Sequence, residues 1–435
     1  MVKKKHKEKL GIKIKKFLKI LGPGVITGAA DDDPSGIATY TQTGAQFGYG
    51  LLWTALAMLP FMMAVQEACA RIGAVTGRGI AAVVKQNYSR KVLFAMVGLV
   101  LVANTINIGA DIGAVASAIQ LIVPINFSLI VLLFTALILF LEIFLSYRVY
   151  SRILKWLCLS LLAYPLTVFL INQPWAEIVR ATLVPNFEFN FAFLFIITGV
   201  LGTTISPYMF FWQASIEVEE EKEHHLLKHG KPHLTRNFLR NLRIDNVVGM
   251  VFSEIATWSI IVVAATVLHN NGIVDVRTAA DAAKALEPLV QTFPNAGFLA
   301  KIIFASGVIG LGLLAIPVLA GSASYALSEA LGLKEGLGLK LKKAHGFYGI
   351  ITIATLVGLC INFIGIDPIK ALVFTAVFNG VAAVPLLFFI AKIAGSKKIM
   401  GKHRSGWLSR SLVWLTFIVM GIAAITMFVT LGQSR

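Results

Sequence analysis

The chain has 435 residues, of which 57% are hydrophobic and 14% are charged. A soluble domain carries about 25% charged residues, so this composition excludes an ordinary soluble enzyme or binding module. The formal net charge of +17 would suggest a nucleic-acid partner in a soluble protein. Here apolar runs of about 20 residues separate the basic clusters, which predicts an all-α polytopic membrane protein surrounded by membrane lipid, with no nucleic acid bound.

Residues 1–16 form a basic arm that lacks the cleavage site of a signal peptide, and we expect it to rest on anionic lipid. Residues 17–431 are predicted to form one transmembrane domain of about eleven helices. The predicted spans are 17–49 (broken), 51–72, 91–122, 128–145, 153–171, 192–218 (broken), 245–269, 298–329, 347–364, 367–391 and 408–431. Most of the 39 Lys and Arg then lie on the side of the N-terminus, which predicts a cytoplasmic N-terminus in the plasma membrane.

The first span contains three consecutive aspartates, residues 31–33, directly before Pro34. Proline has no N–H and disfavours helix at the preceding residue, and Ser35 and Gly36 let the backbone depart further from helical geometry. Irregular backbone at membrane depth is tolerated where it lines a cavity or is buried in protein. Ionisable residues at that depth indicate a functional site. Asp33 adjoins the break and is the expected cation ligand, while one or both of its neighbours cap a helix or are solvated.

The span 192–218 is interrupted in the same way by Pro207, which follows Thr203, Thr204 and Ser206. Proline kinks are common in membrane helices, so this feature alone is weak. Two interrupted helices at positions one and six of eleven are more informative. They would open two inverted five-helix repeats, at about 17–171 and 192–391, with 408–431 as an extra helix, and would place a site near the midplane.

The two breaks offer hard oxygen donors of the kind that bind Mg²⁺, Ca²⁺ and Mn²⁺. The polar face at Asn104, Asn107 and Asp111 suits interhelical hydrogen bonding as well as cavity lining. For Tyr208 and Asn379, a structural role explains the polar side chain at least as well as a role in lining the cavity. The predicted metal ligands are Asp33, Asp32, Ser35, Gly36, Thr203 and Ser206, and the predicted cavity lining is Asp31, Asn104, Asn107, Asp111, Tyr208, Gln213 and Asn379.

Other polar residues suggest structural roles. Glu67 and Arg71 have the spacing of a helical ion pair near the inner surface. Glu142 and Glu254 have no partner that the sequence shows, and they stay unassigned. The loop 219–243 holds four histidines (His224, His225, His229 and His233) whose spacing fits no closed zinc site, so a solvated loop is preferred to a metal sensor. The three cysteines (Cys69, Cys158 and Cys360) are predicted to be packed thiols.

These motifs resemble those of the Nramp family of divalent metal-ion transporters, in particular its divergent, Nramp-related members. The likeness covers nearly the whole chain. It is carried by Gly22-Pro-Gly, Asp33-Pro-Ser-Gly, the segment 44–53 (Gly-Ala-Gln-Phe-Gly-Tyr-Gly-Leu-Leu-Trp) and the segment 202–208 (Gly-Thr-Thr-Ile-Ser-Pro-Tyr). The resemblance implies a leucine-transporter-type inverted-repeat fold, with the metal held between broken helices 1 and 6.

The chain departs from the family pattern at its most informative positions. In the family's Asp-Pro-Gly-Asn motif, Gly36 stands where the second ligand, Asn, would be. In its Met-Pro-His motif, Ser206 replaces the Met and Tyr208 the His. The family's acidic pair on the third span is also lost, with Asp111 beside the two positions. Loss of the thioether favours a harder ion, and the small Ser206 and Gly36 predict room for a partly hydrated one.

The sequence therefore predicts a secondary transporter or uniporter that carries Mg²⁺ or Mn²⁺ inward by alternating access. It is expected to lack stoichiometric proton coupling, cofactors and enzymatic activity. One alternative is a carrier of a small organic or amino-acid substrate on the same fold, although three aspartates disfavour an anion. A remote alternative is an intramembrane aspartyl hydrolase. It would need a second deep aspartate, and Asp111 lacks the glycine-flanked motif of such enzymes.

Overall fold

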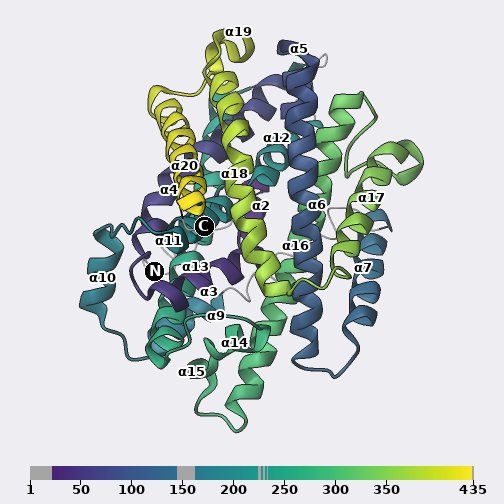
Figure 1. Ribbon diagram of the computed structural model, residues 1–435. Helices are drawn as coiled ribbons and strands as arrows, with labels where there is room; N and C mark the ends of the chain where they lie inside the picture. Colours follow the sequence, from purple (N-terminus) through teal and green to yellow (C-terminus); the bar gives the residue numbers. More distant parts are fainter. Residues whose placement is uncertain (1–21, 145–161, 224–226, 229–230, 233, 434–435) are drawn as a thin grey trace, which may run out of the picture.

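The computed structural model describes residues 22–144, 162–223, 227–228, 231–232 and 234–433. These residues are almost entirely helical, apart from two paired two-residue strands (Figure 1). The elements are α2 (Pro23–Asp31), α3 (Pro34–Phe47), α4 (Trp53–Thr76), α5 (Ile80–Asn87), α6 (Arg90–Gln120), α7 (Phe127–Phe144), α9 (Ala163–Leu170), α10 (Trp175–Leu183), α11 (Phe191–Thr204), α12 (Pro207–Glu223), β1 (Leu227–Lys228), β2 (Lys231–Pro232), α13 (Arg236–Val267), η2 (His269–Asn271), α14 (Ala279–Lys284), α15 (Glu287–Val290), α16 (Ala296–Leu331), η3 (Leu341–Lys343), α17 (His345–Ile361), α18 (Pro368–Gly395), α19 (Lys397–Met400), η4 (Gly401–His403) and α20 (Trp407–Gln433).

Eight helical stretches of the described chain are long and apolar enough to cross a membrane. They are α4, α6, α7, the pair α11 and α12, α13, α16, α18 and α20. The other three predicted spans correspond to the pair α2 and α3, to α9 and to α17, which has 17 residues. Each predicted span thus has a helical counterpart. The protein is an integral membrane protein.

Both predicted breaks are confirmed. Helix α2 ends at Asp31 and α3 begins at Pro34, while α11 ends at Thr204 and α12 begins at Pro207. Each proline takes the first position of a helix, where its missing N–H costs nothing and its fixed φ suits the start. The prolines therefore begin new half-helices rather than kink one long helix.

The contacts between helices follow the predicted repeat. The half-helix α2 contacts α12, and α3 contacts α11. The second spans of the two halves, α4 and α13, also touch, as do the third spans α6 and α16 and the fourth spans α7 and α17. Inverted repeats related by an axis in the membrane plane bring equivalent helices together in this manner. Helix α20 packs outside this arrangement against α18, α11 and α4.

Helix α2 is held directly against α13. A Cβ on Gly28 would stand only 2.3 Å from the carbonyl oxygen of Gly249, so the two backbones touch without intervening side chains. The Asp245 carboxylate of α13 also accepts hydrogen bonds from the N–H groups of Gly22 and Gly24, at 2.8 and 2.7 Å. First-turn N–H groups lack partners within their own helix and favour a negative charge. These contacts fix the direction in which the C-terminal end of α2 points.

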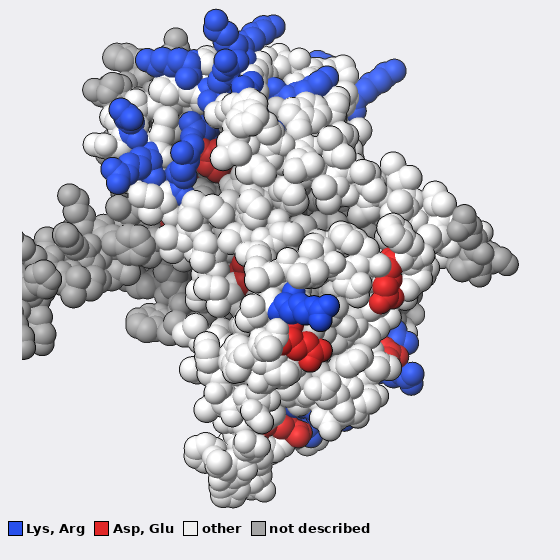
Figure 2. Space-filling model, turned by 90° about the vertical axis from the view of Figure 1, so that its left-hand side faces the viewer, with Lys and Arg blue, Asp and Glu red and all other residues white. Residues whose placement is uncertain are grey.

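Lysine and arginine side chains gather at the end of the molecule that carries α5 and α19, here called the basic end (Figures 1 and 2). The predicted ion pair between Glu67 and Arg71 is confirmed, and Arg243 and Ser409 also bind Glu67. Cys69 is buried as predicted, but the prediction for Cys360 is wrong because its side chain is exposed on α17. Cys158, the four histidines and the basic arm lie outside the described residues.

Candidate cation site at the two helix breaks

The two breaks lie against each other. A Cβ on Gly36 would be 3.2 Å from the Thr203 hydroxyl and 3.4 Å from the carbonyl oxygen of Asp31. The Tyr208 hydroxyl donates to the carbonyl oxygen of Ala30 at 2.7 Å, which ties α12 to the end of α2. The Thr203 hydroxyl thus lies directly beside Gly36.

Asp33 faces α6 and also caps α3. Its Oδ1 accepts hydrogen bonds from the Gly36 N–H at 2.7 Å and the Ser35 hydroxyl at 2.6 Å. Its Oδ2 accepts from Nδ2 of Asn107 at 2.9 Å. Capping was expected from a neighbouring aspartate, but Asp33 itself is the N-cap, since it is the residue before the first helical proline.

Asp31 and Asp32 face α13 instead. The Ser253 hydroxyl donates to Asp31 Oδ2 at 2.7 Å, and the Thr257 hydroxyl contacts Asp32 Oδ1 at 3.4 Å. The other oxygen of each aspartate is buried and has no hydrogen-bond partner. Neither residue is solvated as the sequence suggested, because the relative exposure of both is 0%. The run of three acids therefore points toward two different helices.

The polar stripe on α6 serves two purposes. The Asn104 amide donates to the carbonyl oxygen of Leu319 at 2.9 Å and so links α6 to α16. Asn107 donates to Asp33, as described above. Asp111 is buried, and neither of its carboxylate oxygens has a hydrogen-bond partner. The second and third members of the stripe, Asn107 and Asp111, have buried oxygens without a hydrogen-bond partner.

The remaining predicted residues are all buried but differ in their roles. The Ser206 hydroxyl donates to carbonyl oxygens of the preceding helical turn, those of Gly202 at 2.6 Å and Thr203 at 2.9 Å. The Thr203 hydroxyl has no partner. Gln213 bonds Thr27 and Glu217, nearer to the basic end. Asn379 of α18 has an unpartnered amide nitrogen.

Glu254 is the site residue that the sequence reading missed. It lies on α13, is 5% exposed, and neither of its carboxylate oxygens has a hydrogen-bond partner. It directly follows Ser253, which bonds to Asp31, and it precedes Thr257, which contacts Asp32, by three residues. The sequence does show a polar group around Glu254. Ser253, Glu254 and Thr257 fall within about one turn of an otherwise apolar helix.

The site holds an excess of buried negative charge. None of the ion pairs formed by the described residues involves the five carboxylates, and the helix segments around them contain no Lys or Arg. Charges buried without a partner are costly, so these groups require a cation or protons. Within the described ranges no three His, Cys, Asp or Glu side chains form a ready metal cage. The carboxylates surround the break without converging on one point, and they are Asp31, Asp32, Asp33, Asp111 and Glu254.

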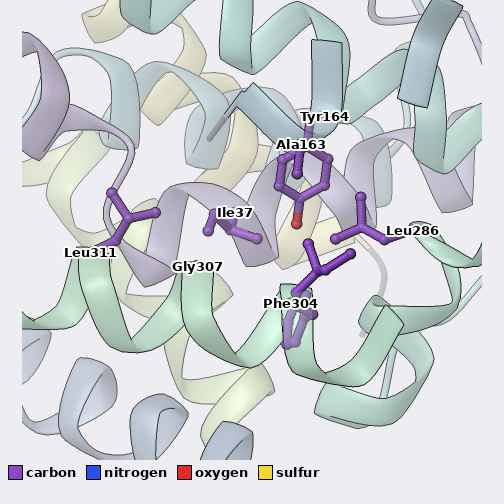
Figure 3. A pocket seen from close by; sticks show the side chains of 8 residues that line it. Ile37, Ala163, Tyr164, Leu286, Phe304, Gly307 and Leu311 are labelled. Carbon is purple, nitrogen blue, oxygen red and sulfur yellow. The ribbon is translucent and has the colours of Figure 1, made fainter. Parts of the chain in front are cut away.

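Small apolar cavities lie beside the first break. Toward the end opposite the basic end, Pro34 lines an apolar cavity of about 10 Å³. A second cavity of about 10 Å³ lies among Ile37, Tyr164, Leu286 and Phe304 (Figure 3). Each has room for about one water molecule. Toward the basic end, α12 buries the polar residues Gln213 and Glu217 among apolar ones.

Residues 24–430 match the sequence pattern of the Nramp family, described as natural resistance-associated macrophage protein-like. The chain belongs to the Nramp family. It is 27% identical over 434 residues to the divalent metal cation transporter MntH of Caldanaerobacter subterraneus subsp. tengcongensis, and the match covers 97% of this chain and 96% of that protein. The predicted family is therefore confirmed.

Solved structures agree with the fold. The Eremococcus coleocola manganese transporter superposes with a TM-score of 0.72 and 16% identity, covering 96% of this Nramp chain and 87% of that one. MhsT in complex with L-phenylalanine superposes with a TM-score of 0.59 and 12% identity, covering 95% and 98%. At these identities the likeness concerns the fold alone. The predicted leucine-transporter-type arrangement, with broken helices 1 and 6, is confirmed.

Proposed function

We propose that this Nramp-family protein carries divalent metal cations, Mn²⁺ or Mg²⁺, across the plasma membrane by alternating access. The observation that carries this proposal is the group of five buried carboxylates around the helix break, which no Lys or Arg of the surrounding segments neutralises. The relatives named divalent metal cation transporter MntH support the same substrate class. The cation is a substrate, and the proposed function is not enzymatic.

The proposed ligands are all oxygen donors. Asp33 and Asp32 supply charge, and the backbone near Ser35, Gly36 and Thr203 supplies carbonyl oxygens. The Ser206 hydroxyl lies at the second break, where the family pattern has a thioether. Carboxylate, carbonyl and hydroxyl oxygens suit Mg²⁺ and Mn²⁺ better than soft ions. The hydrogen bond from Asn107 to Asp33 orients one carboxylate oxygen of this set.

The two alternatives are less well supported. An amino-acid carrier would share the fold seen in MhsT, but the carboxylate of its substrate would meet five buried acids, and like charges repel strongly there. An aspartyl hydrolase would need a water molecule between paired aspartates. Asp33 is committed to capping α3 and to Asn107 instead.

The charge distribution supports an orientation in the membrane. The basic end would be cytoplasmic by the positive-inside rule (Figure 2). The same rule, applied to the Lys and Arg of the loops, favours a cytoplasmic N-terminus.

The test is Mn²⁺ and Mg²⁺ uptake into proteoliposomes by wild type and by Asp33→Ala. We expect the variant to insert normally and to lose uptake by about a hundredfold or more, since a charged ligand is removed. Asp367→Ala is the matched control, because Asp367 also precedes a proline and caps a helix, but at an exposed position. Uptake by Asp33→Ala equal to that of the control would overturn the proposal.

A further inference from the structure

We propose that Glu254 of α13 is a further ligand of the transported divalent cation, which it shares with Asp31 and Asp32. Helix α13 then forms a second wall of the site, opposite the wall that α6 builds around Asp33. This inference rests on the proposed function. It adds to that function a charged ligand from a helix that is not broken.

The first observation is the register between α2 and α13. Hydrogen bonds from Ser253 to Asp31 and from Thr257 to Asp32 fix the two helices at the level of the break. Glu254 belongs to the same stretch of α13, directly after Ser253 and three residues before Thr257, on the same helical face as Thr257. Three carboxylates and two hydroxyls therefore lie along the contact between α2 and α13, here called the seam.

The second observation is independent of the aspartates. The Glu254 side chain is buried, comes from another helix, and leaves both carboxylate oxygens without a hydrogen bond. A carboxylate in that position requires a cation or a proton, because the middle of α13 and the facing α2 contain no Lys or Arg. Asp31 and Asp32 each have one buried oxygen without a hydrogen-bond partner, so they have the same requirement.

The chemistry of the seam favours a divalent ion. The metal ligands that these residues can offer are carboxylate and hydroxyl oxygens, which hard divalent cations prefer. The backbone contact of Gly28 with Gly249, about one turn away, holds α2 and α13 close together at this level.

The experiment measures Mn²⁺ binding to the purified full-length chain in detergent, by electron paramagnetic resonance of the free ion. We expect Glu254→Gln to raise the Kd for Mn²⁺ by about tenfold or more. Glu142→Gln is the matched control, because Glu142 is also buried and unpartnered but lies on α7. We expect that control to bind Mn²⁺ within about twofold of wild type.

Asp33→Asn separates this inference from the proposed function. If wild type binds Mn²⁺, Asp33→Asn loses binding and Glu254→Gln binds as wild type does, then the α13 inference is wrong and the proposed function survives. If wild type itself binds no Mn²⁺, the proposed function is wrong and the inference falls with it.

A thermal-unfolding measurement shows whether Glu254→Gln keeps the fold, so that a loss of Mn²⁺ binding is not caused by unfolding. Without divalent ions, Glu254→Gln should unfold at or above the wild-type temperature, because a repulsive buried charge is removed. Added Mn²⁺ should then raise that temperature less than in wild type.

If Glu254→Gln does not fold, a second variant tests the inference. Thr257→Val removes a hydroxyl at the same seam without changing charge. It should weaken Mn²⁺ binding severalfold, and unchanged binding would overturn the inference.

Discussion

At the scale of single residues, the decisive feature is the direction in which each acid of the 31–33 run points. Asp33 is the cap of α3 and bonds to Asn107 on α6, whereas Asp31 and Asp32 turn to α13. The run itself was evident in the sequence. Its division between two helices depends on the rotation of α2 against its neighbours, which tertiary packing sets and local sequence does not.

Ser206 is the residue at which metal preference should change. Ser206→Met would replace a hydroxyl with a polarisable sulfur, so we expect higher Cd²⁺ affinity and lower Mg²⁺ transport. Competition between the two ions, titrated against wild type and variant, measures the change. Ser206→Ala is the control, because it also removes the hydrogen bonds to Gly202 and Thr203 but adds no sulfur. A wild type that already prefers Cd²⁺, with no change in Ser206→Met, would contradict the hard-ion assignment.

At the scale of helices, the sequence predicted what local chemistry determines. Pro34 and Pro207 marked both breaks, and the apolar runs marked the spans. The sequence left Glu254 unassigned, because the contacts that align α13 with the acids join residues more than 200 positions apart, as between Ser253 and Asp31. The exposure of Cys360 likewise depends on which face of α17 meets its neighbours.

The glycine contact between α2 and α13 gives a prediction at this scale. Gly28→Ala would place a Cβ 2.3 Å from the Gly249 carbonyl oxygen, so the helices must separate. We expect a loss of stability of about 1–3 kcal/mol and a severalfold loss of uptake. Gly98→Ala on α6 is the control, because its Cβ would meet nothing within 4 Å. Thermal unfolding and vesicle uptake measure both effects, and equal behaviour of the two variants would contradict the tight packing described for α2.

At the scale of the whole molecule, the resemblance to the family predicts that α6 lacks the acidic pair that the family uses for proton movement. It puts Ala110 and Gly113 at the two positions. A Cβ on Gly113 would stand 2.3 Å from Oδ1 of Asn362, so a carboxylate could not replace it without displacing that side chain. Tyr208 takes the position of the family histidine and donates its proton to a backbone carbonyl. Of the residues on α6, Asp111 is therefore the one whose role in proton movement we test.

We accordingly expect Mn²⁺ influx into vesicles without stoichiometric acidification of the interior. A pH-sensitive dye inside the vesicles measures proton entry while Mn²⁺ uptake is followed in parallel. Metal-dependent acidification that disappears in Asp111→Asn would show that Asp111 relays protons and would contradict this expectation.

The most direct test is the position of a bound ion. Crystals of the full chain grown with Mn²⁺ should show an anomalous scattering peak at the break between α2 and α3, beside the break between α11 and α12. The peak should lie about 2.0–2.6 Å from carboxylate oxygens of the 31–33 run, and the α13 proposal adds Glu254 to that shell. A well-diffracting crystal at saturating Mn²⁺ with no peak at the break, or with peaks only on the surface, would contradict the assignment of the two breaks as the cation site.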